Sequence, residues 1–212
     1  MKLQLNKPNP STSIFNITGK IILFVLIVFI GYFLRGIKLP EQFIIITDTL
    51  PEGTFNSQLQ NRIILILFLV IAFFLSGRKY QHLFSVSPLK KKETYFWIFG
   101  AMALVVLLLH QPFSFYLLPF RFEEYIQYVI ITCIIVPIDE EFFYRGLLLL
   151  IPFRTLRYAM LFISSFLFAF IHSAVFSSLL LGLALGILAL RFSNLLVPIL
   201  AHSLWNVFSI FF

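Results

Sequence analysis

The run from Cys133 to Arg145 lies in a strongly apolar stretch of this chain, yet it contains four charged side chains: Asp139, Glu140, Glu141 and Arg145. Ionisable groups at membrane depth are costly, so those that occur there usually face the interior of a helix bundle and serve a function. Two further apolar stretches carry one histidine each, His172 and His202. We interpret these groups together as one buried hydrolytic site.

The composition indicates a membrane protein. The chain has 212 residues, of which 60% are hydrophobic and 12% charged, and its mean hydropathy is +0.97. These values lie far outside the range of soluble domains, and several apolar stretches are long enough to cross a bilayer. We therefore expect an all-α, multi-pass transmembrane bundle that forms a single integral-membrane domain over residues 1–212. The single cysteine, Cys133, has no partner for a disulfide and is expected to be a core residue.

The apolar segments predict about seven membrane spans. We place them at residues 14–34, 62–76, 95–110, 124–151, 158–175, 178–190 and 194–212. The first three belong to an N-terminal part, residues 1–121, and the last four to a four-helix catalytic core, residues 122–212. No small-residue cleavage site follows the first span, so we expect it to be an uncleaved anchor.

The basic residues fall into alternate loops. Eleven lie in the loops that we assign to the cytoplasm: Lys2, Lys7, Lys20, Arg78, Lys79, Lys90, Lys91, Lys92, Arg154, Arg157 and Arg191. Four lie on the opposite side: Arg35, Lys38, Arg62 and Arg121. This distribution predicts an N-in, C-out topology and explains the net charge of +7 without a nucleic-acid partner. The partners we expect are the lipid bilayer and a membrane-associated peptide or protein, and the location is a bacterial plasma membrane.

Helix geometry divides the acidic cluster. Glu141 and Arg145 are four residues apart and can form an ion pair, whereas Glu140 lies about 100° further around the helix and faces another neighbour. We expect Glu140 to stay unpaired and to act as a general base. Pro137 removes one backbone donor and should free a carbonyl near the site, with a kink and a trapped water there. Asp139 is expected only to solvate the site. Alternatively, the cluster is a satisfied charge network that fixes helix packing.

Two further pairs are spaced four residues apart. Phe168 and His172 form one pair, and His202 and Asn206 form the other. Either histidine could merely bond a neighbouring backbone group, and a membrane asparagine often serves helix packing. However, at about 1.5 Å rise per residue, Glu140, His172, His202 and Asn206 each lie roughly 16–22 Å from the inner end of their span. This shared depth favours a common site.

These motifs, in this order on successive apolar spans, resemble those of the CPBP intramembrane proteases. That family includes CAAX prenyl endopeptidases and bacteriocin-processing or self-immunity proteins. The resemblance covers about residues 122–212. It implies a membrane endopeptidase in which Glu140, helped by His172, activates a water molecule, while His202 and Asn206 stabilise the oxyanion and Glu141 and Arg145 support the site.

The same residues leave a metal mechanism open. Glu140, His172 and His202 form the two-histidine, one-carboxylate set of hydrolytic zinc enzymes. We favour a glutamate-activated water and no cofactor, because a zinc-bound Glu140 would leave Glu141 both ion-paired and required to act as the base.

Two non-protease functions also fit a buried polar cluster. One is an immunity or scaffold protein that retains the fold without catalysis. The other is a proton- or ion-coupled transporter, although no inverted repeat is apparent. Elsewhere, Gly182 and Gly186 are spaced as Gly-x-x-x-Gly and predict close helix contact.

Overall fold

The computed structural model describes residues 10–37, 54–75, 78–110, 114–115, 117–150 and 156–212. Within these ranges the chain is helical and contains no strand, which confirms the all-α prediction. The α-helices are α1 (Pro10–Leu34), α2 (Thr54–Leu75), α3 (Lys92–Leu109), α4 (Phe122–Val129), α5 (Val136–Glu141), α6 (Arg157–Phe170), α7 (Val175–Phe192) and α8 (Leu196–Phe211). Two 3₁₀ segments, η2 (Arg78–Phe84) and η3 (Pro88–Lys90), connect α2 to α3.

Each predicted span corresponds to helical structure, but several boundaries differ. Helix α2 begins eight residues before the predicted span because Phe55 and Leu59 are buried against Ile131, which extends the helix into a polar segment. Helix α6 ends at Phe170, short of the predicted end at residue 175. Three helices, α2, α3 and α7, are long and apolar enough to cross a membrane by length and composition.

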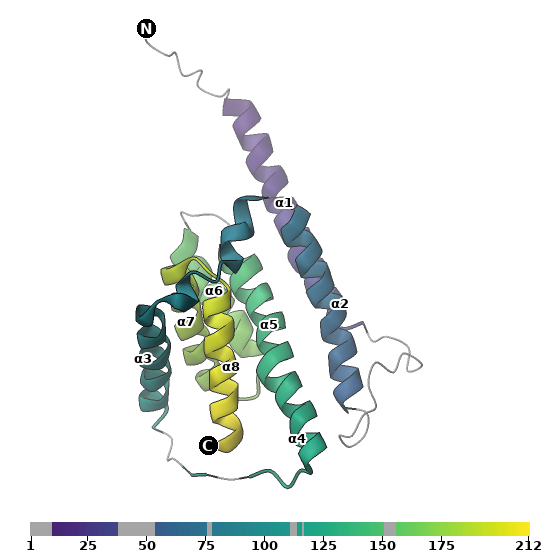
Figure 1. Cartoon of the computed structure of the whole chain (residues 1–212). Coiled ribbons are helices and arrows are strands. Elements are labelled where there is room, and N and C mark those ends of the chain that lie inside the picture. Colours follow the sequence, from purple (N-terminus) through teal and green to yellow (C-terminus); the bar gives the residue numbers. More distant parts are fainter. Residues whose placement is uncertain (1–9, 38–53, 76–77, 111–113, 116, 151–155) are drawn as a thin grey trace.

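The segment from Phe122 to Leu150 is one continuous helical rod (Figure 1). Helix α4 continues into the π-helical segment η4 (Ile130–Ile135), then α5, then a second π-helical segment, η5 (Phe142–Leu150). Proline lacks a backbone N–H and so disturbs the hydrogen bonds of the preceding turn. Here the N–H of Val136 donates to the carbonyl of Ile131, five residues back. Hydrogen bonds with π-helical spacing thus accommodate the missing N–H of Pro137, and the helix continues.

The rod occupies the centre of the bundle, and successive helices run in alternating directions around it (Figure 1). Residues 139–149 are all buried, whichever way they face. Peripheral helices instead expose large apolar side chains: Phe29 and Phe33 on α1 are 69% and 66% exposed. Side chains of this kind suit contact with lipid, whereas Asp139, Glu140, Glu141 and Arg145 of the rod are enclosed by protein.

Helices α6 and α7 pack closely through small residues. A methyl group added at Gly182 would lie 3.2 Å from the Cα atom of Ser165, and one added at Gly186 would collide with Leu161. This contact confirms the prediction made from the Gly-x-x-x-Gly spacing. It also brings the Gly182 carbonyl to the centre of the bundle, where the rod carries its charges.

Candidate active site

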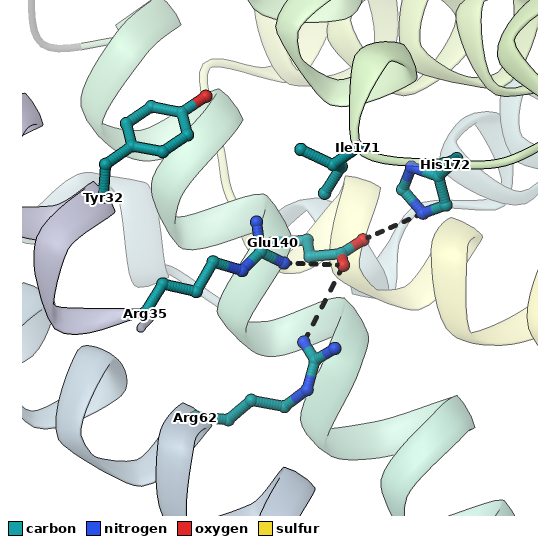
Figure 2. Close-up of a pocket in the computed structure, with 6 residues that line it drawn as sticks. All are labelled: Tyr32, Arg35, Arg62, Glu140, Ile171 and His172. Atoms are coloured by element: carbon teal, nitrogen blue, oxygen red, sulfur yellow. Dashed lines mark hydrogen bonds and ion pairs between the residues drawn. The ribbon is translucent and has the colours of Figure 1, made fainter. Parts of the chain in front are cut away.

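Glu140 lies on α5, is 2% exposed, and has charged partners from other helices. Its Oε1 atom accepts a hydrogen bond from Nη2 of Arg35 at 3.1 Å and lies 3.7 Å from Nη1 of Arg62 (Figure 2). The prediction that Glu140 stays unpaired is therefore wrong. The partners come from the end of α1 and from α2, 105 and 78 residues before Glu140 in the sequence, so the local spacing gave no sign of them.

Asp139 shares these two arginines. Its Oδ2 atom accepts a hydrogen bond from Nη1 of Arg62 at 2.8 Å and lies 3.8 Å from Nη2 of Arg35. The side chain is buried, so its role is more than the solvation that we expected. Two carboxylates and two guanidinium groups together form a charge-balanced cluster, which lowers the cost of burying each charge.

A pocket of about 430 Å³ opens beside this cluster. Its lining residues are Tyr32, Arg35, Arg62, Glu140, Ile171 and His172 (Figure 2). The Oε2 atom of Glu140 is buried and has no hydrogen-bond partner among the described residues. It lies 3.9 Å from Nε2 of His172. This separation is too long for a direct hydrogen bond but suits a bridging water molecule.

His172 follows α6 rather than lying within it. The helix ends at Phe170, with Ile171 as its C-cap, so the prediction of a helical His172 is wrong. Phe168 and His172 nevertheless lie next to each other, as predicted, because Nδ1 of His172 lies 2.8 Å from the carbonyl oxygen of Phe168. A carbonyl only accepts, so Nδ1 carries the proton. In the neutral ring, Nε2 then presents a lone pair toward Glu140.

Glu141 faces a second, separate network. Its Oε1 atom accepts hydrogen bonds from Nη1 of Arg145 and Nδ1 of His202, both at 2.9 Å. This confirms the predicted ion pair between Glu141 and Arg145. Arg145 also donates through Nη2 to the carbonyl of Gly182 at 2.9 Å. The network therefore ties the rod to α7 and α8.

The Phe168 ring lies between the two networks. Its centroid is 4.7 Å from that of His172 and 5.7 Å from that of His202. The guanidinium carbon of Arg145 lies 4.6 Å above the same ring. One aromatic side chain thus packs against both histidines and the Arg145 guanidinium group.

Asn206 binds the backbone of the rod. Its Nδ2 atom donates to the carbonyl of Thr132 at 2.7 Å. In π-helical spacing the donor for Thr132 would be residue 137, which is proline and has no N–H. This carbonyl is therefore the one that Pro137 was expected to free. Neither His202 nor Asn206 lines the pocket around Glu140.

The alternative metal site was predicted from Glu140, His172 and His202. The described part of the chain contains no group of three His, Cys, Asp or Glu side chains arranged to hold a metal ion. In the structure, His202 instead bonds Glu141. The residues present thus do not fit the predicted ligand set.

Arg35, Arg62 and Tyr32 were missed as members of the site. Arg35 and Arg62 were assigned to outer loops by the charge pattern alone. One signal was available: Arg35 directly follows the first predicted span, and Arg62 is the first residue of the second. Arginines at the ends of spans can pair with buried carboxylates on other helices, but the sequence does not indicate which carboxylate each would bind.

Comparison with protein families finds a match to part of the chain. Residues 121–208 match the family described as type II CAAX prenyl endopeptidase Rce1-like. This confirms the resemblance drawn from the motifs, because the match contains all three of them. No curated protein and no solved structure matches the chain.

Proposed function

We propose that this chain, which matches the Rce1-like family of type II CAAX prenyl endopeptidases over residues 121–208, is an intramembrane endopeptidase. It hydrolyses a peptide bond in a membrane-associated substrate. The observation that carries this proposal is the buried, unpartnered Oε2 atom of Glu140, which faces Nε2 of His172 at 3.9 Å in a pocket.

The two groups suit the activation of water. A water molecule at about 2.8 Å from both Oε2 and Nε2 would donate one hydrogen to each. Glu140 then takes one proton as the hydroxide attacks the carbonyl carbon of the scissile bond. When the tetrahedral intermediate collapses, Glu140 returns that proton to the leaving amine. His172 orients the water and lowers the barrier to its deprotonation.

The oxyanion needs donors, for which we propose His202 and Asn206. Asn206 uses one hydrogen of Nδ2 on Thr132 and has a second hydrogen available. His202 gives its Nδ1 hydrogen to Glu141, so it can donate to the oxyanion through Nε2 only when the ring carries a second proton. Substrate binding must bring the scissile carbonyl within reach of these donors, because they lie outside the pocket.

We propose a membrane topology of seven spans, N-in and C-out, in a bacterial plasma membrane. Three basic helix ends support it: α3 begins at Lys92, α6 begins at Arg157, and α7 ends next to Arg191. These ends lie on the same side of the bundle (Figure 1). Arg191 also pairs with Glu93 at 2.7 Å, which joins α7 to α3 there. Arg35 and Arg62 form ion pairs with Asp139 and Glu140, so they add no free positive charge to the outer side. The excess of free basic residues on the cytoplasmic side is therefore larger than the loop count indicated.

The location of the pocket supports a membrane-anchored substrate. Residues of α1, of α2 and of the α6–α7 connection line it, and the apolar outer face of α1 suits contact with lipid. A peptide that is anchored in the bilayer could therefore approach Glu140 from the membrane. A prenylated C-terminus and the leader peptide of a bacteriocin are both substrates of this kind.

The test uses Glu140→Ala, His172→Ala and His202→Ala in the purified full-length protein in lipid vesicles. A farnesylated peptide with a C-terminal CAAX sequence and a membrane-anchored leader peptide serve as probes. Each substitution should abolish cleavage while expression is retained. Glu93→Ala is the control, because Glu93 is an exposed acid in a distant ion pair. Zinc content is measured on the same samples.

Three outcomes would change the proposal. A fully active Glu140→Ala protein would refute the assigned role. Stoichiometric zinc that is lost together with activity would replace the water mechanism by a metal mechanism. If the biological effect of the protein survived all three substitutions, a non-enzymatic immunity or scaffold role would be supported instead.

A further inference from the structure

The two carboxylate oxygens of Glu140 have different environments. Oε1 lies within 4 Å of two guanidinium groups, those of Arg35 at 3.1 Å and Arg62 at 3.7 Å. Oε2 has no hydrogen-bond partner among the described residues and faces His172. A free carboxylate can exchange its two oxygens by rotation about its last side-chain bond, which is a soft torsion. Here the hydrogen bond from Arg35 and the nearby positive charge of Arg62, both at one oxygen, oppose that rotation.

Packing of the N-terminal helices brings the arginines to this place. On α1, Gly31 allows the Phe143 ring to approach, and Tyr32 packs edge-on against the same ring at 5.0 Å. Arg35 follows one helical turn after Gly31 and also donates to the Tyr144 hydroxyl at 3.3 Å. Its position is therefore fixed by contacts with η5.

Arg62 is placed in a similar way by α2. Phe55 and Leu59 pack against Ile131 of the rod, and Arg62 follows Leu59 by one turn on the same side of the helix. Its hydrogen bond to Asp139 at 2.8 Å is the shortest contact in the cluster. Asp139 thus holds the guanidinium that approaches Glu140. Both arginines lie outside residues 121–208, the part that matches the family.

We propose that Arg35 and Arg62 are positioning residues for Glu140, with Asp139 as the anchor of Arg62. Arg35 donates a hydrogen bond to Oε1 and Arg62 forms an ion pair with it, and together they direct Oε2 toward His172 and the attacking water. The two positive charges also lower the cost of burying two carboxylates beside an apolar core. This proposal rests on the proposed protease function, because it assigns the catalytic carboxylate to Glu140.

The arrangement uses specific properties of arginine. A guanidinium group is planar and presents several donors in fixed directions, so Arg35 can bind Glu140 and Tyr144 together. Arg62 likewise approaches two carboxylates through Nη1. A lysine would keep the positive charge but not this geometry. The side chains of Arg35 and Arg62 are 24% and 18% exposed, so a substitution can be accommodated without a large cavity.

The experiment compares Arg35→Gln, Arg62→Gln, Arg35→Lys and Arg62→Lys in the full-length protein in vesicles, with the farnesylated CAAX peptide as probe. Misplacement of a catalytic group can cost about 10²-fold in rate. We expect each glutamine variant to lower kcat about that much with KM nearly unchanged, and each lysine variant to recover part of it. Arg191→Gln is the matched control, because Arg191 forms an equally close but exposed ion pair away from the pocket.

A second readout does not depend on cleavage. The infrared difference spectrum between the wild type and Glu140→Gln isolates the carboxylate bands of Glu140. In the Arg35→Gln, Arg62→Gln double variant, the two oxygens become more alike, so the spacing between the antisymmetric and symmetric bands should change. An unchanged spacing would overturn the proposal, even if the peptide probe is not cleaved by the wild type.

The kinetic outcomes also separate this proposal from the function on which it rests. If Glu140→Ala is inactive and the glutamine variants keep the wild-type kcat, the positioning role fails while the protease remains. A rise in KM alone would assign the arginines to substrate binding. A fall in thermal stability with normal kcat would assign them to packing. An active Glu140→Ala would refute both proposals.

Discussion

The Oε1 atom of Glu141 accepts hydrogen bonds from both Arg145 and His202 at 2.9 Å. All three side chains are buried. Glu140, the adjacent residue, lines a pocket and pairs with two arginines, Arg35 and Arg62. Two consecutive glutamates therefore have separate surroundings. Glu140 lines the pocket, and Glu141 belongs to a network that joins the rod to α7 and α8.

Arg145→Met should be strongly destabilising. Removing one member of a buried ion pair leaves the other charge uncompensated and costs about 3–5 kcal/mol. The double variant Glu141→Leu, Arg145→Met should recover part of this loss because no isolated charge remains. Thermal unfolding in detergent measures both, with Arg191→Met as an exposed control that should change stability by about 1 kcal/mol or less. Equal losses in the single and double variants would contradict this role of the pair.

Asn206→Ala should destabilise the protein by about 1–3 kcal/mol, because it leaves the Thr132 carbonyl without its side-chain donor. Pro137→Ala restores a backbone N–H to the rod. In the double variant, this N–H can donate to the freed carbonyl, so stability should partly recover. Cleavage should not recover, since the oxyanion donor is still missing. Unfolding and cleavage are measured on the same samples. Recovery of both would show that Asn206 has only a structural role.

Gly182→Ala should weaken the contact between α6 and α7. The added methyl group would meet the backbone of Ser165 at 3.2 Å, and a backbone cannot move aside as a side chain can. Overpacking of this kind costs about 1–3 kcal/mol. Gly100→Ala is the control, because no atom lies within 4 Å of its added methyl group. It should be neutral or stabilise α3 by up to about 1 kcal/mol. Similar melting temperatures for the two variants would contradict close packing at Gly182.

The proposed topology places Ser87 in the cytoplasm and Ser114 outside. Each is replaced by cysteine in a Cys133→Ala background, and intact cells are treated with a membrane-impermeant maleimide. Ser114→Cys should react directly, whereas Ser87→Cys should react only after permeabilisation. The reverse pattern would show that the chain has the opposite orientation.

The sequence predicted those features that depend on local spacing. The ion pair between Glu141 and Arg145 follows from a separation of four residues on one helix, and the free carbonyl follows from the missing N–H of Pro137. The end of α6 was missed because hydropathy is continuous there, although the helix stops before His172. Arg35 and Arg62 were missed for another reason. Their partners depend on how α1 and α2 pack against the rod, and no spacing within either helix encodes that.

The proposed protease activity depends on Glu140 as the general base that activates the attacking water. The most direct measurement compares membrane peptides, by quantitative mass spectrometry, from cells that express the wild type, Glu140→Gln or Arg191→Gln at equal levels. We predict one set of cleavage products in the wild type and in Arg191→Gln that is missing in Glu140→Gln. The same products at the same abundance in Glu140→Gln would contradict the account.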